Sequence, residues 1–199
     1  MKITHLTSAH PRVDTRIFFK MCSSLANKGF DVSLVVADGK GDETKSGVKI
    51  VDVGPSKNRF FRILSAPKRV YSKAVLIDAD IYHLHDPELL PIGLKLKKCG
   101  KTVIFDSHED IPKQMLTKPY LNKSLLKLLS FSIKKYEAWV CKQLDGVITA
   151  TPFIREKFLK INPNSIDINN FPILVELSTD VKWKDKKKEV CYVGGIDKI

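Results

Sequence analysis

The amino-acid sequence predicts an α/β domain with a doubly wound parallel sheet, and three observations lead to that prediction. Seven short segments are apolar on both faces, as strands are when helices cover both sides of a sheet. Helical stretches lie between most of these segments, and such alternation is typical of parallel sheets. The chain of 199 residues has an ordinary hydrophobic content of 43%, and no apolar run is long enough to span a membrane. The predicted strands are 3–7, 32–37, 48–53, 80–85, 102–105, 146–149 and 165–168.

The first predicted helix follows the first strand. Asp14 suits its N-terminal cap, because a short acidic side chain can accept hydrogen bonds from the free N–H groups of the first turn. Apolar residues from Ile17 to Ala26 recur at helical spacing, and Gly29 suits the end of the helix. A loop rich in glycine and charged residues, 38–47, then joins the second and third predicted strands.

Three further helices complete the alternation. Pro87 can open the helix after the fourth strand as its first residue, and Gly100 ends it. Residues 122–144 form a long helix with an apolar stripe and a lysine-rich face. Thr151 caps the last helix, and Pro152 is its first residue.

The regular alternation of predicted strands and helices ends after residue 172, and this indicates the domain organisation. We expect one domain over 1–174, a lysine-rich linker over 175–188, and the start of a second domain over 189–199. A strand that leads into a Gly-Gly turn, as at 190–195, usually opens a further βα unit. The chain is therefore expected to stop just inside the second domain.

Charge and composition limit the partners and the compartment. The formal net charge of +12 indicates an anionic partner, but basic stretches interleaved with stacking aromatic residues are absent, so nucleic acid is not expected. The lysine-rich helix 122–144 either covers the sheet with solvated lysines or also contacts an anionic membrane surface. The polar start is no signal peptide, and the four dispersed cysteines form no disulfide or zinc pattern. We expect a cytoplasmic protein that, in the membrane-contacting case, is peripheral at the inner face of the cell membrane.

The loop after the first strand is a candidate for substrate binding. It carries no GxGxxG dinucleotide fingerprint and no P-loop pattern. It offers His10, Arg12, Asp14 and Arg16 at the start of a helix, a place suited to anions. Capping by Asp14 and solvation of the two arginines explain the same residues without any ligand.

Histidine and carboxylates follow two consecutive strands of the predicted sheet. His85 and Asp86 end the fourth strand, and His108, Glu109 and Asp110 come after the fifth. Carboxyl ends of parallel strands share one edge of the sheet, where open α/β sheets bind ligands. Histidine is the side chain best suited to exchanging a proton near neutral pH.

We therefore predict His108, Glu109 and Asp110 as the catalytic group, with His85 and Asp86 as the adjacent wall. His83 shares a face with His85, because strand residues two apart point the same way. A helix start explains Asp86 as a cap and Glu88 as a first-turn acid without any function. No metal is expected, because His85 and His108 lack further ligands at tetrahedral spacing.

Several motifs taken together resemble those of bacterial group 1 (family 4) glycosyltransferases, in the branch associated with capsule and surface-polysaccharide assembly. They are the runs at 6–18 (LTSAHPRVDTRIF), 82–91 (YHLHDPELLP) and 105–110 (FDSHED), and 190–196 (VCYVGGI) is similar to the start of that family's nucleotide-sugar domain. The resemblance implies a GT-B fold, in which two Rossmann-like domains face each other across a cleft. The first domain binds the acceptor, and the second holds most of the nucleotide-sugar.

The resemblance also implies chemistry. Transfer in the family is retaining and generally independent of metal, with the nucleotide-sugar as co-substrate and no other cofactor. A histidine after the fifth strand lines the cleft near the transferred sugar, and His108 matches it. Many members carry a Gly-Gly loop after the first strand, where this chain has Ala9-His10-Pro11-Arg12.

The sequence is therefore interpreted as the N-terminal, acceptor-binding domain of a hexosyl- or N-acetylhexosaminyltransferase. Its partners would be a nucleotide-sugar donor and a saccharide or lipid-linked saccharide acceptor. Because most donor contacts lie in the second domain, we expect the chain alone to be inactive. Two alternatives stay open: a non-catalytic Rossmann-like module that docks to a membrane or partner, and a GT-B sugar-nucleotide epimerase.

Overall fold

The computed structural model describes residues 1–117, 122–172 and 181–190. The chain divides into two units, Met1–Asn169 and Asn170–Ile199. Within the described part of the second unit there is one short 3₁₀ turn, Trp183–Asp185. The predicted linker lies partly outside the described residues, and the predicted strand and glycine pair at 190–196 lie almost wholly outside them, so the domain boundaries stay a prediction. The site described below belongs to the first unit.

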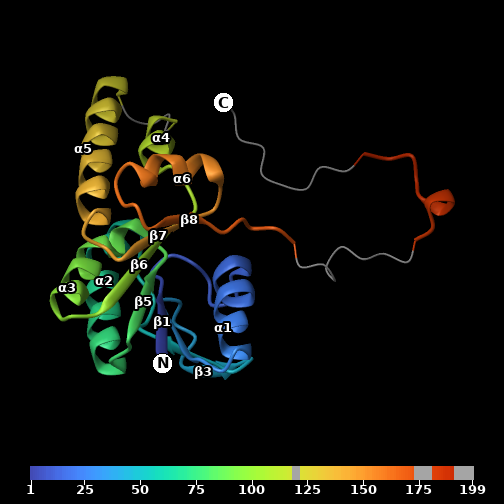
Figure 1. The fold of residues 1–199 in the computed structure, drawn as a ribbon, viewed down its shortest axis with the longest axis horizontal. Coiled ribbons are helices and arrows are strands. Elements are labelled where there is room, and N and C mark those ends of the chain that lie inside the picture. The colour runs from blue at the N-terminus through green and yellow to red at the C-terminus, as the bar shows by residue number, and fades with distance from the viewer. Residues whose placement is uncertain (118–121, 173–180, 191–199) are drawn as a thin grey trace. The chain divides into compact units, whose positions relative to one another are not determined.

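The first unit is built on one eight-stranded sheet, which confirms the predicted doubly wound α/β fold (Figure 1). The strand order is β3-β4-β2-β1-β5-β6-β7-β8, and all neighbours are parallel except β3 and β4. All seven predicted strands form. The bounds are β1 Lys2–Leu6, β2 Asp31–Val36, β3 Glu43–Lys45, β4 Val48–Asp52, β5 Ile81–Leu84, β6 Thr102–Ser107, β7 Gly146–Thr149 and β8 Ser165–Asp167.

Strand β3 lies in the segment that was predicted as a loop. Ser46 and Gly47, the two residues between β3 and β4, have φ angles of 50° and 75°. Positive φ at both central positions is the requirement of the tight hairpin turn that best fits strand twist. The segment therefore pairs with β4 in an antiparallel hairpin at the edge of the sheet.

Helices cover both faces of the sheet. Residues Ile17, Phe18 and Cys22 of the first helical segment pack against β2 and β4 on one face. Four of the later helices, α2, α3, α5 and α6 in the bounds that follow, pack apolar residues against β1, β5, β6 and β7 on the opposite face. The bounds are η1 Thr15–Cys22, α1 Ser23–Asn27, α2 Arg59–Ile77, η2 Pro87–Leu89, α3 Leu90–Lys98, α4 Ile111–Leu116, α5 Lys123–Cys141 and α6 Pro152–Leu159.

The start of the first helical segment is wound as a π-helix. Asp14 caps it as predicted, accepting hydrogen bonds from the N–H groups of Arg16 and Ile17 at 2.9 and 2.8 Å. The N–H of Phe19 then donates to the carbonyl oxygen of Asp14, five residues back. Such wide turns are rare in proteins, and those that occur often lie near functional sites.

The strand order creates a crevice next to β1. From β1 the chain runs outward through β2 to the hairpin of β3 and β4, and it then returns through α2 to β5 on the other side of β1. The connections after β1 and β5 therefore leave in opposite directions, and ligands of open α/β sheets bind at the carboxyl ends of strands at such a point. Helix α2, which makes this return, was not delimited from the sequence.

No helix in the described ranges combines the length and the apolar character needed to cross a membrane. Cys22, Cys99 and Cys141 are free thiols, and Cys191 lies outside the described residues.

Candidate functional site

All five histidines of the chain gather beside the crevice. His5 on β1 and His83 on β5 are partners in the parallel register, and their ring centroids are 4.8 Å apart. His83 and His85 share a face as predicted, at 4.5 Å. His108, just after β6, lies 6.1 Å from His85 and 5.1 Å from His10 in the loop after β1. No role was predicted for His5 from the sequence.

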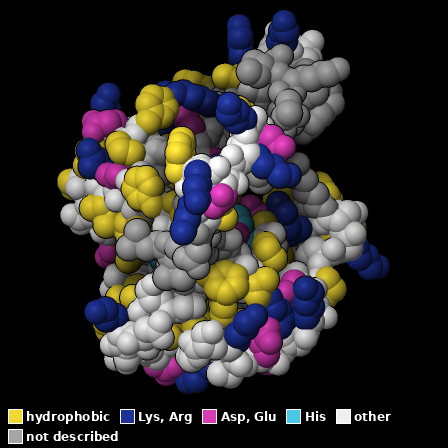
Figure 2. Space-filling model, turned by 90° about the vertical axis from the view of Figure 1, so that its right-hand side faces the viewer, with side chains coloured by type: hydrophobic (Ala, Val, Ile, Leu, Met, Phe, Trp, Pro, Cys, Tyr) yellow, Lys and Arg dark blue, Asp and Glu magenta, His cyan; other side chains and the backbone are white. Residues whose placement is uncertain are grey.

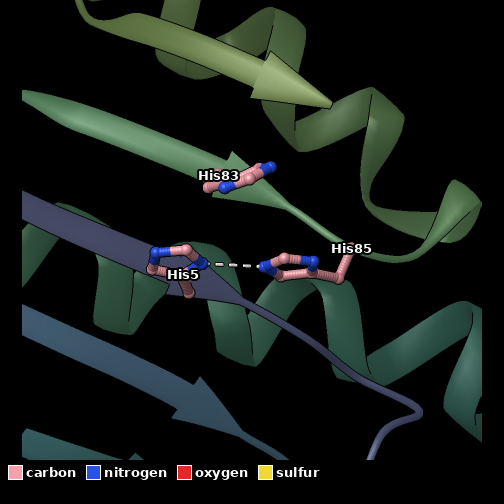
Figure 3. A group of neighbouring side chains, drawn as sticks. All are labelled: His5, His83 and His85. Atoms are coloured by element: carbon pink, nitrogen blue, oxygen red, sulfur yellow. Dashed lines mark hydrogen bonds between the residues drawn. The ribbon is translucent and has the colours of Figure 1, made fainter. Parts of the chain in front are cut away.

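Three of these histidines form a buried group (Figure 3). Nδ1 of His5 lies 2.9 Å from Nε2 of His85. Burial is the main reason why the pKa of His83 falls to about 3 and why the pKa values of His5 and His85 are also lowered. All three rings are therefore neutral near pH 7. The Nε2 atoms of His5 and His83 have no hydrogen-bond partner in the described part of the chain.

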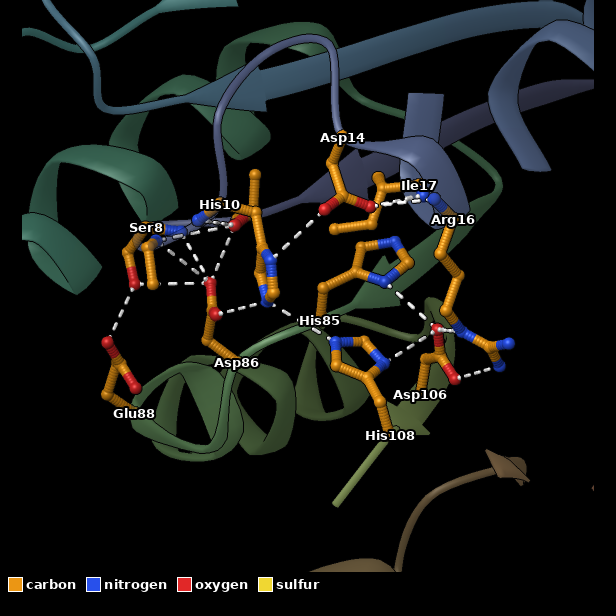
Figure 4. A network of polar contacts seen from close by, with 12 residues as sticks. Ser8, His10, Asp14, Arg16, Ile17, His85, Asp86, Glu88, Asp106 and His108 are labelled. Carbon is orange, nitrogen blue, oxygen red and sulfur yellow. Dashed lines mark hydrogen bonds and ion pairs between the residues drawn. The ribbon is translucent and has the colours of Figure 1, made fainter. Parts of the chain in front are cut away.

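Asp106, the carboxylate on which this cluster converges, lies near the end of β6 (Figure 4). Arg16 binds it with two hydrogen bonds of 2.9 and 2.7 Å, and Nδ1 of His85 and of His108 lie 3.3 and 3.2 Å from its Oδ2. Burial by itself would raise the pKa of Asp106, but the contacts with His108, His85 and Arg16 lower it well below its usual range. No role was predicted for Asp106 from the sequence.

Neither contact of these rings with Asp106 has the alignment of a hydrogen bond, but the carboxylate still favours one tautomer of each ring. An ionised carboxylate can only accept, so the Nδ1 atoms of His85 and His108 that face it carry the hydrogen. Neutral His85 then has a free lone pair on Nε2, which accepts from Nδ1–H of His5. Burial would lower the pKa of His108, but Asp106 outweighs it and the pKa is raised. His108 is thus the ring of the Asp106 group that gains a proton most easily.

Asp86 braces the loop after β1. Its Oδ2 accepts from the hydroxyl of Thr7 at 2.8 Å and from the backbone N–H groups of Ser8 and Ala9 at 2.6 and 3.2 Å. Its Oδ1 lies 3.4 Å from Nε2 of His10. The prediction that Asp86 caps the following helix is wrong, because its side chain makes no capping hydrogen bond and turns toward this loop instead.

The neighbouring acid Glu88 is also held by this edge of the crevice. Its Oε1 accepts from the hydroxyl of Ser8 at 3.1 Å and lies 3.1 Å from Nε of Arg62 on α2. Glu88 therefore connects the loop after β1 with the helix that crosses back to β5. Figure 4 shows its contact with Ser8.

Two cavities open at this edge of the sheet. The first, of about 210 Å³, is lined by His10, His85, Asp86, His108 and Glu109, so five of the predicted site residues meet in one place. The second, of about 530 Å³, has a lining that includes Ser8, Ala9, Ser56, Asn58 and Arg62. Because Ala9 and Arg62 line both, the two cavities are adjacent. Figure 2 shows histidine atoms at the floor of a hollow in the surface.

Arg12, predicted to bind substrate, is engaged inside the protein. Its guanidinium donates two hydrogen bonds to Asp38, of 2.8 and 2.7 Å, one to Glu43 and one to the carbonyl oxygen of Gly41. It thereby fastens the loop after β1 to the loop after β2. Its role in substrate binding stays a prediction.

The two acids after His108 differ in their surroundings. Glu109 lines the smaller cavity, whereas Asp110 lies 3.2 and 3.5 Å from the ammonium groups of Lys157 and Lys113. The carboxylate that contacts His108 is that of Asp106, two residues before His108 and outside the predicted group. The catalytic roles of Glu109 and Asp110 stay predictions.

Two groups of side chains have the chemistry of metal ligands: His5 with His83 and His85, and His85 with Asp106 and His108. In the second group the guanidinium of Arg16 already contacts both oxygens of Asp106 and would repel a cation. The first group consists of three buried, neutral imidazoles, a donor set that zinc accepts, so the expected independence of metal stays a prediction.

Comparison with solved structures defines the class of fold. A sucrose-phosphate synthase from Thermosynechococcus elongatus superposes with a TM-score of 0.60 at 13% identity, covering 84% of this chain and 47% of that one. A UDP-glucose: anthocyanidin 3-O-glucosyltransferase in complex with UDP gives 0.60 at 9%, covering 92% and 55%. A structure from E. coli described as trehalose-6-phosphate bound with UDP-2-fluoro glucose gives 0.53 at 12%, covering 81% and 42%.

The chain spans about half the length of these three proteins. Its fold is the predicted Rossmann-like N-terminal half of a GT-B glycosyltransferase. The model of Glycosyltransferase Family 4 matches residues 15–168, so the chain belongs to that family. A search of curated proteins found no significant match. The resemblance to family 4 is confirmed, and the capsule and surface-polysaccharide branch stays a prediction.

Proposed function

We propose that this chain forms the acceptor-binding half of an enzyme that transfers a sugar from a nucleotide-sugar donor. One observation carries the proposal: His108 is anchored by Asp106 at Nδ1 and lines a cavity at the carboxyl edge of the sheet. Membership of Glycosyltransferase Family 4 supports the reaction class. Neither a non-catalytic role nor the epimerase alternative has a specific observation in its favour.

In this proposal His108 orients or polarises a hydroxyl group of the transferred sugar or of the acceptor. The raised pKa of His108 suits a ring that donates a hydrogen bond near neutral pH. His85 and Asp86 form the adjacent wall, and the loop from His10 to Arg16 borders the acceptor. A positioned acid or base of this kind contributes about 10²- to 10⁴-fold to a rate.

The larger cavity is the proposed place of the acceptor, a saccharide or a lipid-linked saccharide. Hydroxyl and amide groups of Ser8, Ser56 and Asn58 line it, and such groups suit the hydroxyls of sugars. UDP and UDP-2-fluoro glucose appear in the two transferase-fold structures named above, which supports a nucleotide-sugar donor here. The proposed transfer is retaining, needs no metal and moves a hexose or N-acetylhexosamine in surface-polysaccharide synthesis.

Helix α5 supports the proposed contact with an anionic membrane surface at the inner face of the cell membrane. Leu128, Phe131 and Trp139 are more than half exposed on it. Lys134 and Lys135 are exposed on the same helix, and Nζ of Lys135 lies 5.5 Å from the ring centre of Phe131. Exposed apolar side chains next to lysines are suited to the boundary between water and anionic headgroups.

Replacement of His108 by alanine in the full-length enzyme tests the proposal. We expect turnover to fall by about 10²- to 10⁴-fold while the thermal unfolding curve stays close to that of the wild type. Lys101→Ala, a change of similar size far from the cavities, is the control and should leave turnover unchanged. Near-normal turnover of His108→Ala would overturn the proposed role, and sugar inversion without an acceptor would favour the epimerase.

The isolated chain of 199 residues is expected not to transfer sugar. It spans about half the length of the similar transferase structures, so most contacts with a donor would come from outside it. Transfer by the chain alone, measured with a labelled nucleotide-sugar, would contradict this expectation.

A further inference from the structure

Two histidines of the buried group have no role in the proposed transfer. His5 and His83 lie opposite each other on β1 and β5, and His85 follows His83 on the same face (Figure 3). All three residues are at most 6% exposed. A buried polar side chain requires a partner, yet the Nε2 atoms of His5 and His83 have none among the described residues. The group therefore offers ring nitrogens that the rest of the described fold does not use.

The three rings lie as close together as the ligands of a single ion. One ring nitrogen of each histidine lies within 4.8 Å of one ring nitrogen of the other two. Nδ1 of His5 and Nε2 of His85 are closer, at 2.9 Å. Zinc holds imidazole nitrogens at about 2.0–2.1 Å in a tetrahedral arrangement, so two such nitrogens lie about 3.3 Å apart. The separations in the group bracket this value, so adjustment of the side chains is enough to close a site.

Each ring can act as a ligand without losing a proton. Zinc binds the neutral form of imidazole, and the three buried rings are neutral near pH 7. A neutral imidazole carries a hydrogen on one nitrogen and a lone pair on the other, and the two can exchange places. When the hydrogen of His5 moves from Nδ1 to Nε2, the nitrogens of His5 and His85 that face each other both present lone pairs, and an ion can take the place of the hydrogen between them.

The surroundings of His85 are those of a metal-bound histidine. Its Nδ1 lies 3.3 Å from Oδ2 of Asp106, so Nδ1 keeps its hydrogen and Nε2 presents the lone pair. Ligating histidines almost always direct their second nitrogen to a carboxylate, a backbone carbonyl or water, which fixes the ring and raises its basicity. His85 also lines the smaller cavity, which gives an ion a path from solvent.

We propose that His5, His83 and His85 bind one zinc ion, which ties β1 to β5 and fixes the ring of His85 at the wall of the smaller cavity. Three protein nitrogens leave the fourth position of the tetrahedron to a water molecule, as in other zinc sites with three protein ligands. The inference goes beyond the proposed function, because the ion takes no part in any step of the transfer.

Metal titration of the chain tests the proposal without substrate. The untagged chain is stripped of metal with EDTA, freed of EDTA, and titrated with zinc chloride. We expect it to take up one equivalent, with a rise in the midpoint of thermal unfolding, because the ion binds the folded state. Cobalt(II) in place of zinc should give the intense visible absorption of tetrahedral coordination. Absence of uptake at one equivalent, or the weak spectrum of octahedral cobalt, would overturn the proposal.

Single variants identify the ligands. His83→Leu should weaken zinc binding by more than about 100-fold, since loss of a ligand exceeds the effect of losing a group that only supports one. In EDTA the same variant should unfold no earlier than the wild type, because an orphan nitrogen has been removed. His5→Gln, on the neighbouring strand, should weaken zinc binding likewise.

The matched control is His108→Ala. It also removes one imidazole, but from the alternative donor set of His85, Asp106 and His108, and it should leave zinc affinity unchanged. Zinc binding that survives His83→Leu, or that is lost in His108→Ala, would assign the ion to other ligands and contradict the proposal. The cobalt spectrum of the unaltered chain decides the geometry even if a variant does not fold.

Discussion

Arg16 holds Asp106 through two hydrogen bonds of 2.9 and 2.7 Å, although ninety positions separate these residues in the chain. Both side chains are almost fully buried. Arg16 also donates to the carbonyl oxygen of Ile168 at 2.7 Å, so it joins η1, β6 and the residue after β8. The ion pair fixes the carboxylate on which His85 and His108 converge, and its removal should disturb both stability and the site.

Asp106→Asn keeps the shape of the side chain but leaves the buried guanidinium of Arg16 without a counter-charge. Breaking a buried ion pair from one side costs about 3–5 kcal/mol, so the free energy of unfolding should fall by that amount in denaturant titrations. The pKa of His108 should also fall, because burial then acts without the opposing carboxylate. Recovery of part of the stability in Arg16→Gln/Asp106→Asn would show that the unpaired charge is the cause.

The buried histidines predict a loss of stability in acid. Their pKa values are lowered in the folded chain, so the unfolded chain binds more protons below about pH 6.5. Their contribution is therefore fully present above pH 6.5 and is lost as the pH falls. For His83, with a pKa of about 3, the loss by pH 3 is on the order of 4 kcal/mol.

Other groups of the site modify this profile. The lowered pKa of Asp106 adds a loss of stability in the same direction, below the ordinary range of aspartate. The raised pKa of His108 acts oppositely: its contribution is present at low pH and is lost as the pH rises through the folded value. In His83→Leu the acid slope of the unfolding free energy should decrease, without loss of stability at pH 7, because the orphan Nε2 is removed. An unchanged slope would contradict the assignment.

Arg12→Met should loosen the loops after β1 and β2. The change removes hydrogen bonds to Asp38, Glu43 and Gly41, and we expect a loss of about 2 kcal/mol, because Asp38 can still reach water. Hydrogen exchange of the amides at 39–41 should accelerate. The control is Lys49→Met, which breaks an exposed ion pair and should cost less than about 1 kcal/mol. Equal effects of both changes would argue against a buried clamp at Arg12.

The lysines of α5 predict binding to anionic vesicles. The chain should bind phosphatidylglycerol-containing vesicles but not phosphatidylcholine alone, with a blue shift of tryptophan fluorescence from the exposed Trp139. Lys134→Glu/Lys135→Glu should weaken binding at least about tenfold, because each lysine near the surface contributes about 1 kcal/mol.

A matched charge reversal distinguishes vesicle binding through α5 from binding that depends only on net charge. Lys28→Glu/Lys40→Glu changes the charge equally on exposed positions outside α5 and should have a smaller effect. Equal weakening by both double variants would show that overall charge, rather than α5, governs binding.

The sheet and its functional edge could be predicted because their signals are local. Buried parallel strands are apolar on both faces, and side chains that follow neighbouring strands meet at one edge. His10, His85, Asp86 and His108 were therefore placed near one another correctly. Strand β3 was missed because its turn uses Ser46-Gly47, a weaker signal than Asn-Gly.

The organisation of the site could not be predicted, because it depends on contacts between distant segments. The sequence places Asp106, Glu109 and Asp110 all within two residues of His108, and only the direction of each side chain shows that Asp106 is the partner. The sequence alone does not distinguish His5 from other strand residues, and only the register of β1 and β5 shows that it lies opposite His83. A usable signal did exist: His5 and His83 are histidines within strands, where a buried polar side chain requires a partner.

Asp86 gives the loop after β1 an electrostatic preference. By accepting the N–H groups of Ser8 and Ala9, it supplies a resident anion at the turn where related folds often receive a ligand's phosphate. A second anion arriving there would meet like charge and find the backbone donors already occupied. We therefore expect this turn to disfavour anionic groups of a ligand and to accept neutral ones.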